Sequence, residues 1–187
     1  MDKQVKKLTA NDWLEAALQV LASDGASAVS VEPLAKKLGV TKGSFYWHFK
    51  NRKVLIQNLL EYWEGIEKQY TAEYLSQYPK PDVFLAESLT ILIQDDVNKC
   101  VFLSLSESKE DLDIEGAYRR AVNRRLDVWE NAYNAMGLNK KLSHDRAYET
   151  YCSYFGLIKL LVDQPVNLNQ SEVNRLIKRV IAAAICI

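Results

Sequence analysis

The stretch "VEPLAKKLGVTKGSFYWHFKNRKVL" (residues 31–55) contains two short helical patterns separated by a tight turn. Ser30 precedes the first pattern as a predicted N-cap, and Pro33 is tolerated because it falls in the unpaired first turn. Gly39 is expected to end this helix, and Thr41 is expected to cap the next one. Two short helices joined by a turn that contains glycine predict a helix-turn-helix, in which the second helix enters a DNA groove.

The second of these helices is predicted to have two different faces. At about 100° per residue, Phe45 and Phe49 lie together and are expected to anchor the helix against its neighbours. Gly43, Tyr46 and Trp47 point the other way. An indole and a phenol on a solvated face need something to cover them. A DNA major groove about 12 Å wide fits that need, and the alternative is a packing patch against another domain.

The residues around these aromatics have the chemistry expected of backbone contacts to DNA. The hydroxyls of Thr41 and Ser44 can donate hydrogen bonds, and Gly43 allows close approach of the backbone. His48 lies at the border of the two faces, so it either contacts phosphate or bridges two helices. A cation at Lys53 opposes the dipole of the next helix, which costs about 0.3 to 1 kcal/mol that a nearby phosphate would offset. The expected phosphate clamps are Lys42, Lys50, Arg52 and Lys53.

Helical periodicity continues through the rest of the chain, and no run of strict alternation calls for a sheet. A first helix is predicted from the cap at Thr9 to Gly25, with Asp12 completing a capping box. Asn51 is expected to cap a long helix that ends at "YPKPD" (residues 78–82). Further helices are expected near 83–97, 100–106, 114–136, 143–162 and 171–186. The prediction is an all-α protein with a helix-turn-helix domain at 1–53 and a helical effector-binding and dimerisation domain at 54–187.

Composition excludes several other classes of protein. The 187 residues are 48% hydrophobic, without an apolar run long enough for a membrane helix or a signal peptide, so the expected location is cytoplasmic. Three widely spaced cysteines and two distant histidines argue against a disulfide framework and a metal site, although redox sensing by the thiols stays an alternative. No phosphate loop or nucleophile motif is found, so neither an enzyme nor a cofactor is expected. Residues 1–53 hold nine Lys and Arg against five Asp and Glu, whereas the remainder holds 15 against 19.

Residues 8–55 resemble the tetracycline-repressor (TetR) family of bacterial regulators. The family pattern of Thr, any residue, Gly, a small residue, an apolar residue, Tyr, any residue, His and Phe is met over residues 41–49. The resemblance implies DNA contacts from Thr41, Lys42, Gly43, Ser44, Tyr46, Trp47, His48 and Arg52. Lys53 departs from the family, which usually carries an acid at that position.

The last two predicted helices carry a surplus of apolar residues, which makes them a candidate interface. The resemblance implies that they form a four-helix seam with their symmetry mates in a homodimer. The alternative is that they close the core of a monomer. The predicted seam residues are Phe155, Ile158, Val162, Val173, Leu176, Ile177, Val180, Ile181 and Ala184.

The middle helices combine aromatic and polar residues. Proteins of the family bind small molecules between such helices, and an apolar cavity with a few hydroxyls would suit a hydrophobic or aromatic effector. The alternative for each residue is plain core packing. The predicted pocket residues are Tyr62, Trp63, Ile66, Phe102, Trp129, Tyr133, Tyr151 and Tyr154.

The sequence therefore predicts a ligand-responsive transcriptional regulator, most simply a repressor. It is expected to bind a pseudo-palindromic double-stranded DNA operator as a homodimer, with half-sites about 34 Å apart or a stretched equivalent. A small-molecule effector that prefers the other conformer would release it. The alternative is an interaction protein that keeps the fold, binds a protein partner through its body and no longer needs DNA.

Overall fold

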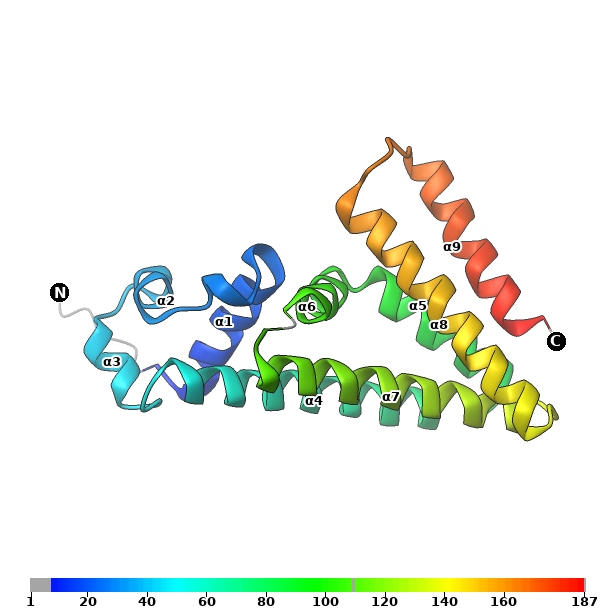
Figure 1. Cartoon of the computed structure of the whole chain (residues 1–187), viewed down its shortest axis with the longest axis horizontal. Coiled ribbons are helices and arrows are strands. Elements are labelled where there is room, and N and C mark those ends of the chain that lie inside the picture. The colour runs from blue at the N-terminus through cyan, green and yellow to red at the C-terminus, as the bar shows by residue number, and fades with distance from the viewer. Residues whose placement is uncertain (1–7, 109, 187) are drawn as a thin grey trace.

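The computed structural model describes residues 8–108 and 110–186. Every regular element within these ranges is helical, so the predicted all-α class is confirmed. Figure 1 shows a small head at one end, two long helices side by side below, and a helical body at the other end. The elements are α1 (Ala10–Asp24), the 3-10 helix η1 (Ala26–Ala28), α2 (Val31–Leu38), α3 (Lys42–Tyr46), α4 (Arg52–Gln77), α5 (Pro81–Gln94), α6 (Asp96–Glu107), α7 (Leu112–Ala135), α8 (Lys140–Asp163) and α9 (Gln170–Ile185).

The start of α1 follows the predicted capping box. The Thr9 side chain accepts a hydrogen bond from the Asp12 backbone amide, and the Asp12 carboxylate accepts one from the Thr9 backbone amide. Two of the helix's otherwise unpaired donors are thereby satisfied. Gly25 ends α1 with a φ of 80°, a conformation that favours glycine. Residues 1–7 of the predicted head, with three of its lysines, lie outside the described residues.

The turn between α2 and α3 depends on Gly39. This residue adopts the left-handed conformation (φ 68°, ψ 30°) and donates its backbone N–H to the last turn of α2. Ser30 and Thr41 occupy the N-cap positions with extended backbone, but their side chains make no capping hydrogen bond. The α-helix α3 is also shorter than predicted, because regular helix ends at Tyr46. The Phe49 amide still donates to the Phe45 carbonyl at 3.0 Å, which keeps both rings on one side.

The long helix α4 connects the head to the body. Asn51 caps it by accepting the Val54 amide at 3.0 Å, as predicted. Its buried residues all lie in the first half, up to Glu64, whereas none between residues 65 and 77 is fully buried. The helix runs without a break through the predicted domain boundary after residue 53. One continuous helix is thus shared by the two predicted domains.

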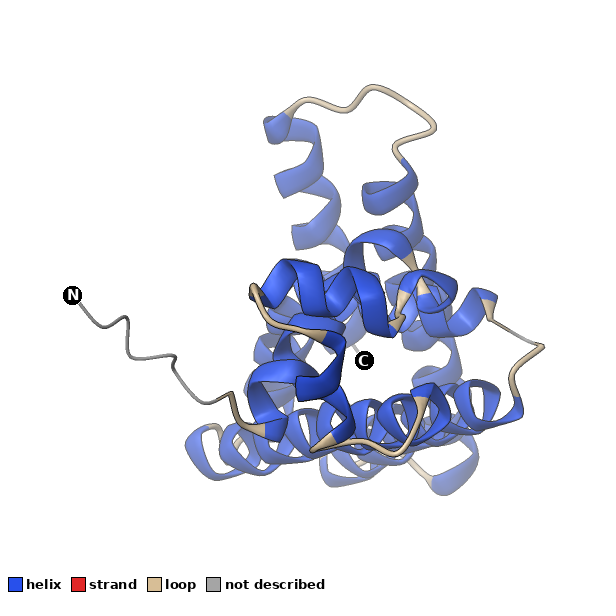
Figure 2. Ribbon diagram, turned by 90° about the vertical axis from the view of Figure 1, so that its left-hand side faces the viewer, coloured by secondary structure: helices blue, strands red, loops and turns tan. Residues whose placement is uncertain are grey.

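The body contains α5 to α9. Two helices predicted near 83–97 and 100–106 are divided differently in the structure, because Asp95 leaves the helical conformation and caps α6 through the Asn98 amide at 3.0 Å. Helix α9 packs against α5 and α8, and α7 packs against α8. Figure 2 shows the loop between α8 and α9 projecting from the top of the body. Helix α1 rests on α6 and α4, so one hydrophobic core extends from the head into the body.

Candidate functional site

The short helix α3 is held in place by two buried phenylalanines. Phe45 is fully buried and Phe49 is 1% exposed. Trp13 of α1 meets Phe45 edge to face, with the ring centroids 5.5 Å apart, and Phe45 lies at the same distance from Phe49. Burying each ring contributes about 1.5 to 3 kcal/mol, which compensates for the weak intrinsic stability of a five-residue helix. The position of α3 is therefore set by its packing against α2 and by the contact of Phe45 with Trp13 of α1.

The opposite side of α3 carries exposed aromatic area, as the helical wheel predicts. Trp47 is 87% exposed and Tyr46 is 62% exposed. Trp47 caps the end of α3 in the right-handed helical region, so its side chain continues the outward face of that helix. Nothing in the described chain shields this indole, and the two rings form the largest aromatic surface of the head.

The small residues of α3 differ in how accessible they are. Thr41 and Gly43 are exposed, whereas Ser44 and His48 are half-buried. A Cβ built at Gly43 would meet no atom closer than the Thr41 Oγ1 at 3.6 Å. The fold itself therefore does not require glycine at this position. The small size of Gly43 leaves room for something outside the chain.

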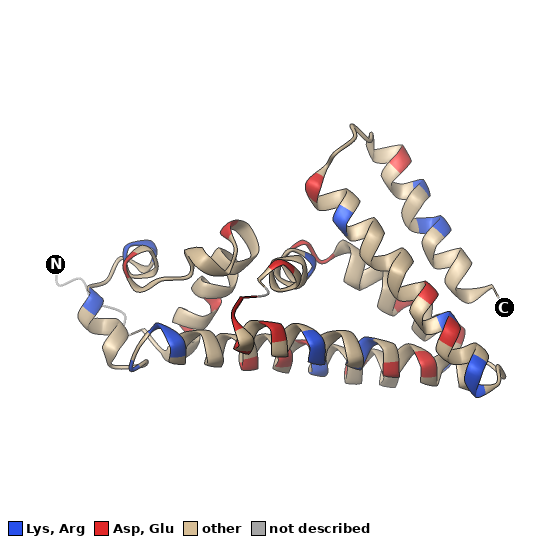
Figure 3. Ribbon diagram, in the orientation of Figure 1, with Lys and Arg blue, Asp and Glu red and all other residues tan. Residues whose placement is uncertain are grey.

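The predicted cations fall into two groups. Lys50 and Lys53 are exposed beside α3. Lys42 is exposed as well, but it pairs with Glu32 of α2. Because a surface ion pair is worth only about 0 to 1 kcal/mol, a phosphate can compete with Glu32 for this ammonium group. Figure 3 shows the basic residues of α2, α3 and the start of α4 at the head end of the molecule.

Arg52 has a role within the head that was not predicted. Its Nε donates to the Val29 carbonyl and one terminal nitrogen donates to the Ala26 carbonyl, both at 2.7 Å. The guanidinium thus ties the first turn of α4 to η1 and the extended backbone that follows η1. The sequence could not reveal this because the accepting carbonyls carry no residue signature. Arg52 thus helps to hold the head together, as does the Lys42–Glu32 pair between α3 and α2.

The body contains a cavity of about 70 Å³ between α4, α5, the start of α6 and α7. Of the eight predicted pocket residues, the structure places Trp129 on its wall and the others elsewhere. The lining residues that the sequence analysis did not predict include Tyr70 and Tyr74 of α4 and Phe84 of α5. The sequence did carry a signal for them, because the two tyrosines are four residues apart and all three rings flank the break at residues 78–82. The charged and polar residues that line the cavity include Glu67, Asp95, Asn98, Arg124 and Arg125.

Most of the other predicted pocket residues are core residues. Trp63 is 2% exposed and donates its indole N–H to the Asn98 Oδ1 at 2.8 Å. Tyr133 is fully buried, and its hydroxyl bonds to the Thr150 hydroxyl and donates to the Ala184 carbonyl. Phe102 is fully buried beneath the Arg125 guanidinium, 3.7 Å from its ring centroid. These aromatics are satisfied within the fold and do not form a pocket.

The last four predicted pocket residues also lie away from the cavity. Tyr62 faces Glu15 of α1, where burial, followed by the charge of Glu15, raises the pKa of its phenol. Ile66 is half-buried against the core. The Tyr151 hydroxyl lies 2.9 Å from that of Tyr118. Tyr154 is fully buried, and burial raises its pKa to about 12.

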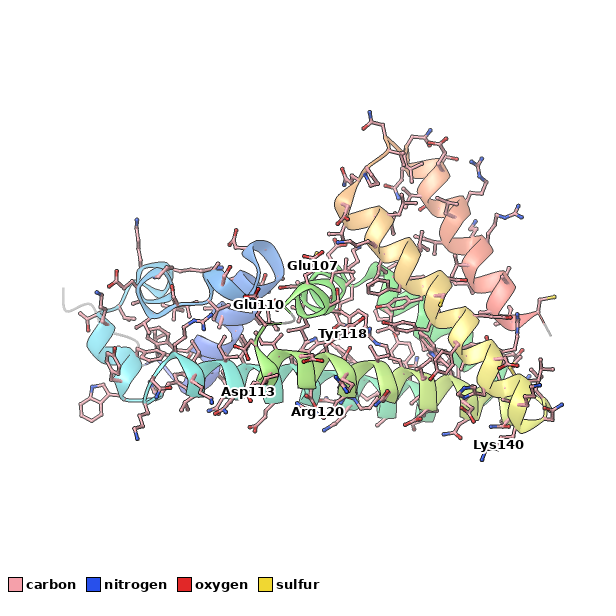
Figure 4. All side chains as sticks on the ribbon, in the orientation of Figure 1. Glu107, Glu110, Asp113, Tyr118, Arg120 and Lys140 are labelled. Carbon is pink, nitrogen blue, oxygen red and sulfur yellow. The ribbon has the colours of Figure 1, made fainter. Side chains whose placement is uncertain are left out.

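A network of ion pairs joins α4 to α7 beside the cavity. Glu64 accepts from Arg120 at 3.0 and 2.6 Å and from Arg124 at 3.2 Å. Glu67 accepts from Arg124 at 3.3 Å and pairs with Arg125. Figure 4 shows Arg120 below α7 and Tyr118 above it, so their side chains leave that helix on different sides. The two carboxylates are three residues apart on α4, and the other arginines that they face on α7 lie four and five residues after Arg120. Charged residues at this spacing share one face of a helix, so the sequence did carry a signal for this network.

Arg125 is the most enclosed member of this network. Burial, the largest influence, opposes its charge, but Tyr154 and Glu67 outweigh it and raise the pKa of the guanidinium. Its Nη1 donates to the Tyr154 hydroxyl at 3.2 Å. A buried charge of this kind persists because it is paired and hydrogen-bonded. The pair with Glu67 therefore connects α4 to the middle of the body.

The predicted dimer residues are of two kinds. Ile158 is fully buried and Ala184 is 4% exposed within the single chain, so the expectation that they face a partner is wrong. Both fill the space between α8, α9 and the core. The other predicted seam residues are half-buried, which leaves part of their apolar area uncovered: Phe155, Val162, Val173, Leu176, Ile177, Val180 and Ile181.

Metal-ligating side chains and thiols are spread over the fold. Within the described residues, no group of three or more His, Cys, Asp or Glu side chains is placed to hold a metal ion. Across those same ranges, each helix is too short or too polar to cross a bilayer. The described cysteines are free thiols: Cys100 is half-buried, and Cys152 and Cys186 are exposed.

Comparison with known proteins assigns the head. Residues 14–59 match the sequence model for bacterial regulatory proteins of the tetR family. The chain is 32% identical over 98 residues to the HTH-type transcriptional regulator AcrR of Shigella flexneri, an alignment that covers 52% of this chain and 46% of that protein. The matched stretch thus spans less than half the length of this curated relative.

Solved structures extend the likeness to the whole fold. A transcriptional regulator from Saccharomonospora viridis in complex with choline superposes with a TM-score of 0.79 at 16% identity, covering 91% of this chain and 92% of that one. The regulator FadR from Bacillus subtilis in complex with stearoyl-CoA gives a TM-score of 0.67 at 19% identity, covering 95% and 98%. The segment from α1 to the first half of α4 thus matches the tetR family of bacterial regulatory proteins, and the whole chain shares the fold of these solved transcriptional regulators.

Proposed function

We propose that the chain is a homodimeric repressor that binds a pseudo-palindromic DNA operator through two copies of α3 and is released by a small-molecule effector. The observation that carries the proposal is the orientation of α3. Phe45 and Phe49 fix one side in the core while Trp47, at 87% exposure, and Tyr46 face outward. A helix presented in this way fits a major groove, and the neighbouring lysines supply the phosphate contacts. Such a regulator would act on DNA in the bacterial cytoplasm.

The effector would act through α4. This helix begins beside α3, and in the body its Glu67, Tyr70 and Tyr74 line the cavity. Beyond Glu67, which is paired with Arg124 and Arg125, no residue of α4 is fully buried, so this end of the helix is held less firmly than the half beneath the head. A ligand that prefers a shifted α4 must weaken DNA binding by the same coupling factor. Proteins of similar fold have been solved in complex with choline and with stearoyl-CoA, which supports a small-molecule effector for this chain.

Operator binding can be tested with duplexes that the wild-type protein selects from a randomised pool. The selected duplexes would be labelled, and binding would be followed by fluorescence anisotropy at several salt concentrations. Trp47→Ala is expected to weaken binding by about 1 to 3 kcal/mol, roughly 5- to 150-fold. The matched control is Leu112→Ala, which removes an 81% exposed apolar side chain from the start of α7.

The outcomes separate the regulator from its alternative. A loss in Trp47→Ala with no loss in Leu112→Ala, at unchanged helical content, supports DNA reading by α3. Equal affinities for all three proteins would overturn the proposal and leave an interaction protein that uses its body. Wild-type affinity that does not fall steeply with salt would also contradict phosphate clamping.

A further inference from the structure

The cavity in the body combines aromatic rings with a small volume. Tyr70 and Tyr74 of α4, Phe84 of α5 and Trp129 of α7 contribute to its wall. The face of an aromatic ring carries negative potential and attracts a cation within about 6 Å. A single water molecule needs about 10 to 15 Å³ of cavity volume. The cavity volume of about 70 Å³ therefore suits a small head group rather than a large ligand.

The arginines on the wall are already paired with carboxylates. Arg125 pairs with the Glu67 Oε1, donates to the Tyr154 hydroxyl and stacks over Phe102. Arg124 donates its two terminal nitrogens to the Glu64 Oε2 at 3.2 Å and the Glu67 Oε2 at 3.3 Å. Both oxygens of Glu67 are therefore engaged. Each guanidinium is therefore already hydrogen-bonded to at least one carboxylate.

Asp95 is in the opposite situation. Asp95 is one of the residues that line the cavity, and its carboxylate accepts the Asn98 amide through Oδ1 at 3.0 Å. Lys99, the nearest lysine along the chain, instead directs its ammonium group to Asp96 and to the Ile93 carbonyl. Among residues 8–108 and 110–186, no Lys, Arg or His lies within ion-pair distance of Asp95. Capping of α6 accounts for one oxygen and would be served equally by a neutral Asn.

From these contacts we infer that the cavity binds the head group of a small organic ammonium ion, with Asp95 as its counter-ion and the surrounding rings as its cation–π partners. The inference rests on the proposed function, because it names the chemical class of the effector. A carboxylate with no cationic partner at the edge of an aromatic cavity is best satisfied by a ligand that brings the positive charge. The hydrogen bonds of Arg124 and Arg125 go to Glu64, Glu67 and Tyr154, and neither guanidinium pairs with Asp95.

Three probes of nearly equal shape test the charge requirement. Choline is the cation, 3,3-dimethyl-1-butanol is its neutral carbon isostere, and 3,3-dimethylbutanoate is an anion with the same bulky end. Each would be titrated into the full-length protein by isothermal calorimetry in the absence of DNA. Choline is expected to bind at least about tenfold more tightly than the other two. Equal binding of the neutral or anionic probe, or no detectable heat with millimolar choline, would overturn the inference.

A variant pair then locates the counter-ion. Asp95→Asn keeps the capping geometry of α6 and removes the charge, so choline affinity should fall about tenfold while the neutral probe is unaffected. Asp111→Asn is the matched control, because Asp111 caps α7 in the same way through the Asp113 and Ile114 amides and does not line the cavity. Equal choline affinity in Asp95→Asn and Asp111→Asn would refute the role of Asp95. Because these measurements use DNA-free protein, their failure is distinguishable from failure of operator binding.

Discussion

Arg52 and Val29 lie 23 positions apart in the sequence, yet the Arg52 Nε is 2.7 Å from the Val29 carbonyl oxygen. A second bond of the same length joins the guanidinium to the Ala26 carbonyl. The first residue of α4 thereby holds the segment that leads into α2. The neighbouring Lys53, by contrast, is exposed and donates no such internal bond to the described chain.

The adjacent pair Arg52 and Lys53 gives a matched test of stability against DNA binding. Arg52→Met removes both internal hydrogen bonds and should lower the free energy of unfolding by about 1 to 2 kcal/mol, measured by urea denaturation. Lys53→Met should leave stability unchanged or raise it by a few tenths of a kcal/mol, because a cation leaves the first turn of α4. Its effect should be on DNA, with the slope of log affinity against log salt becoming shallower by about 0.9 for each phosphate that the protein no longer neutralises. An unchanged slope in Lys53→Met would remove Lys53 from the interface.

The buried pair between Glu67 and Arg125 should make a large contribution to stability. The two side chains are 10% and 7% exposed, so Glu67→Gln leaves a buried guanidinium without its counter-ion. The expected decrease is about 3 to 5 kcal/mol in the free energy of unfolding from urea denaturation. Glu73→Gln on the same helix, where Glu73 accepts only an exposed bond from Gln69, is the control and should change little. A decrease below about 1 kcal/mol in Glu67→Gln would mean that the pair is solvated in solution.

The buried phenol of Tyr154 is expected to make the fold less stable at alkaline pH. Burial is the largest cause of its raised pKa of about 12, compared with an ordinary value near 10. Because the folded state holds the phenol proton more tightly than the unfolded state, the protonated phenol contributes to the free energy of unfolding. This contribution is complete below about pH 10 and is lost as the pH rises towards 12, by up to about 1.4 kcal/mol per pH unit. Tyr154→Phe should therefore show a shallower alkaline decline in the unfolding free energy than the wild type. Identical slopes would assign the decline to other groups.

The uncovered apolar area of α8 and α9 predicts self-association. Ile177→Glu places a charge among the half-buried residues of α9 and should convert a dimer into a monomer in sedimentation velocity, because a buried charge without a partner is costly. Asn174→Glu on the exposed side of the same helix is the control and should remain dimeric. A wild-type protein that sediments as a monomer at micromolar concentration would contradict the proposed seam.

Much of the head follows from local sequence signals. The capping box of Thr9 and Asp12, the left-handed Gly39 and the cap at Asn51 each involve residues within a few positions of one another. The same is true of the two faces of α3, because Phe45, Phe49 and Trp47 are placed by helical periodicity alone. Family likeness adds the identity of this unit, but the orientation of its side chains is predictable from their spacing.

The body was predicted less well because its site depends on contacts between distant residues. Aromatic residues at helical spacing can fill a core or line a cavity, and the sequence does not distinguish the two. Tyr133 donates to the Ala184 carbonyl and Phe102 packs against the Arg125 guanidinium, so both are core residues. Tyr70, Tyr74 and Phe84 line the cavity instead. Asp95 fits a continuous helix in the sequence pattern, but in the structure its conformation ends α5.

The sequence by itself determined the all-α class, the order of the helices and the outward presentation of Trp47, because helix periods and caps act over one or two turns. Tertiary structure alone decided that Arg52 stabilises the head, that Ile158 and Ala184 are interior, and that Asp95 faces a cavity without a cationic partner among the described residues. Those outcomes depend on which surfaces of α4, α5 and α7 are brought together. Such long-range pairing is set by the packing of the whole chain and leaves no local signature.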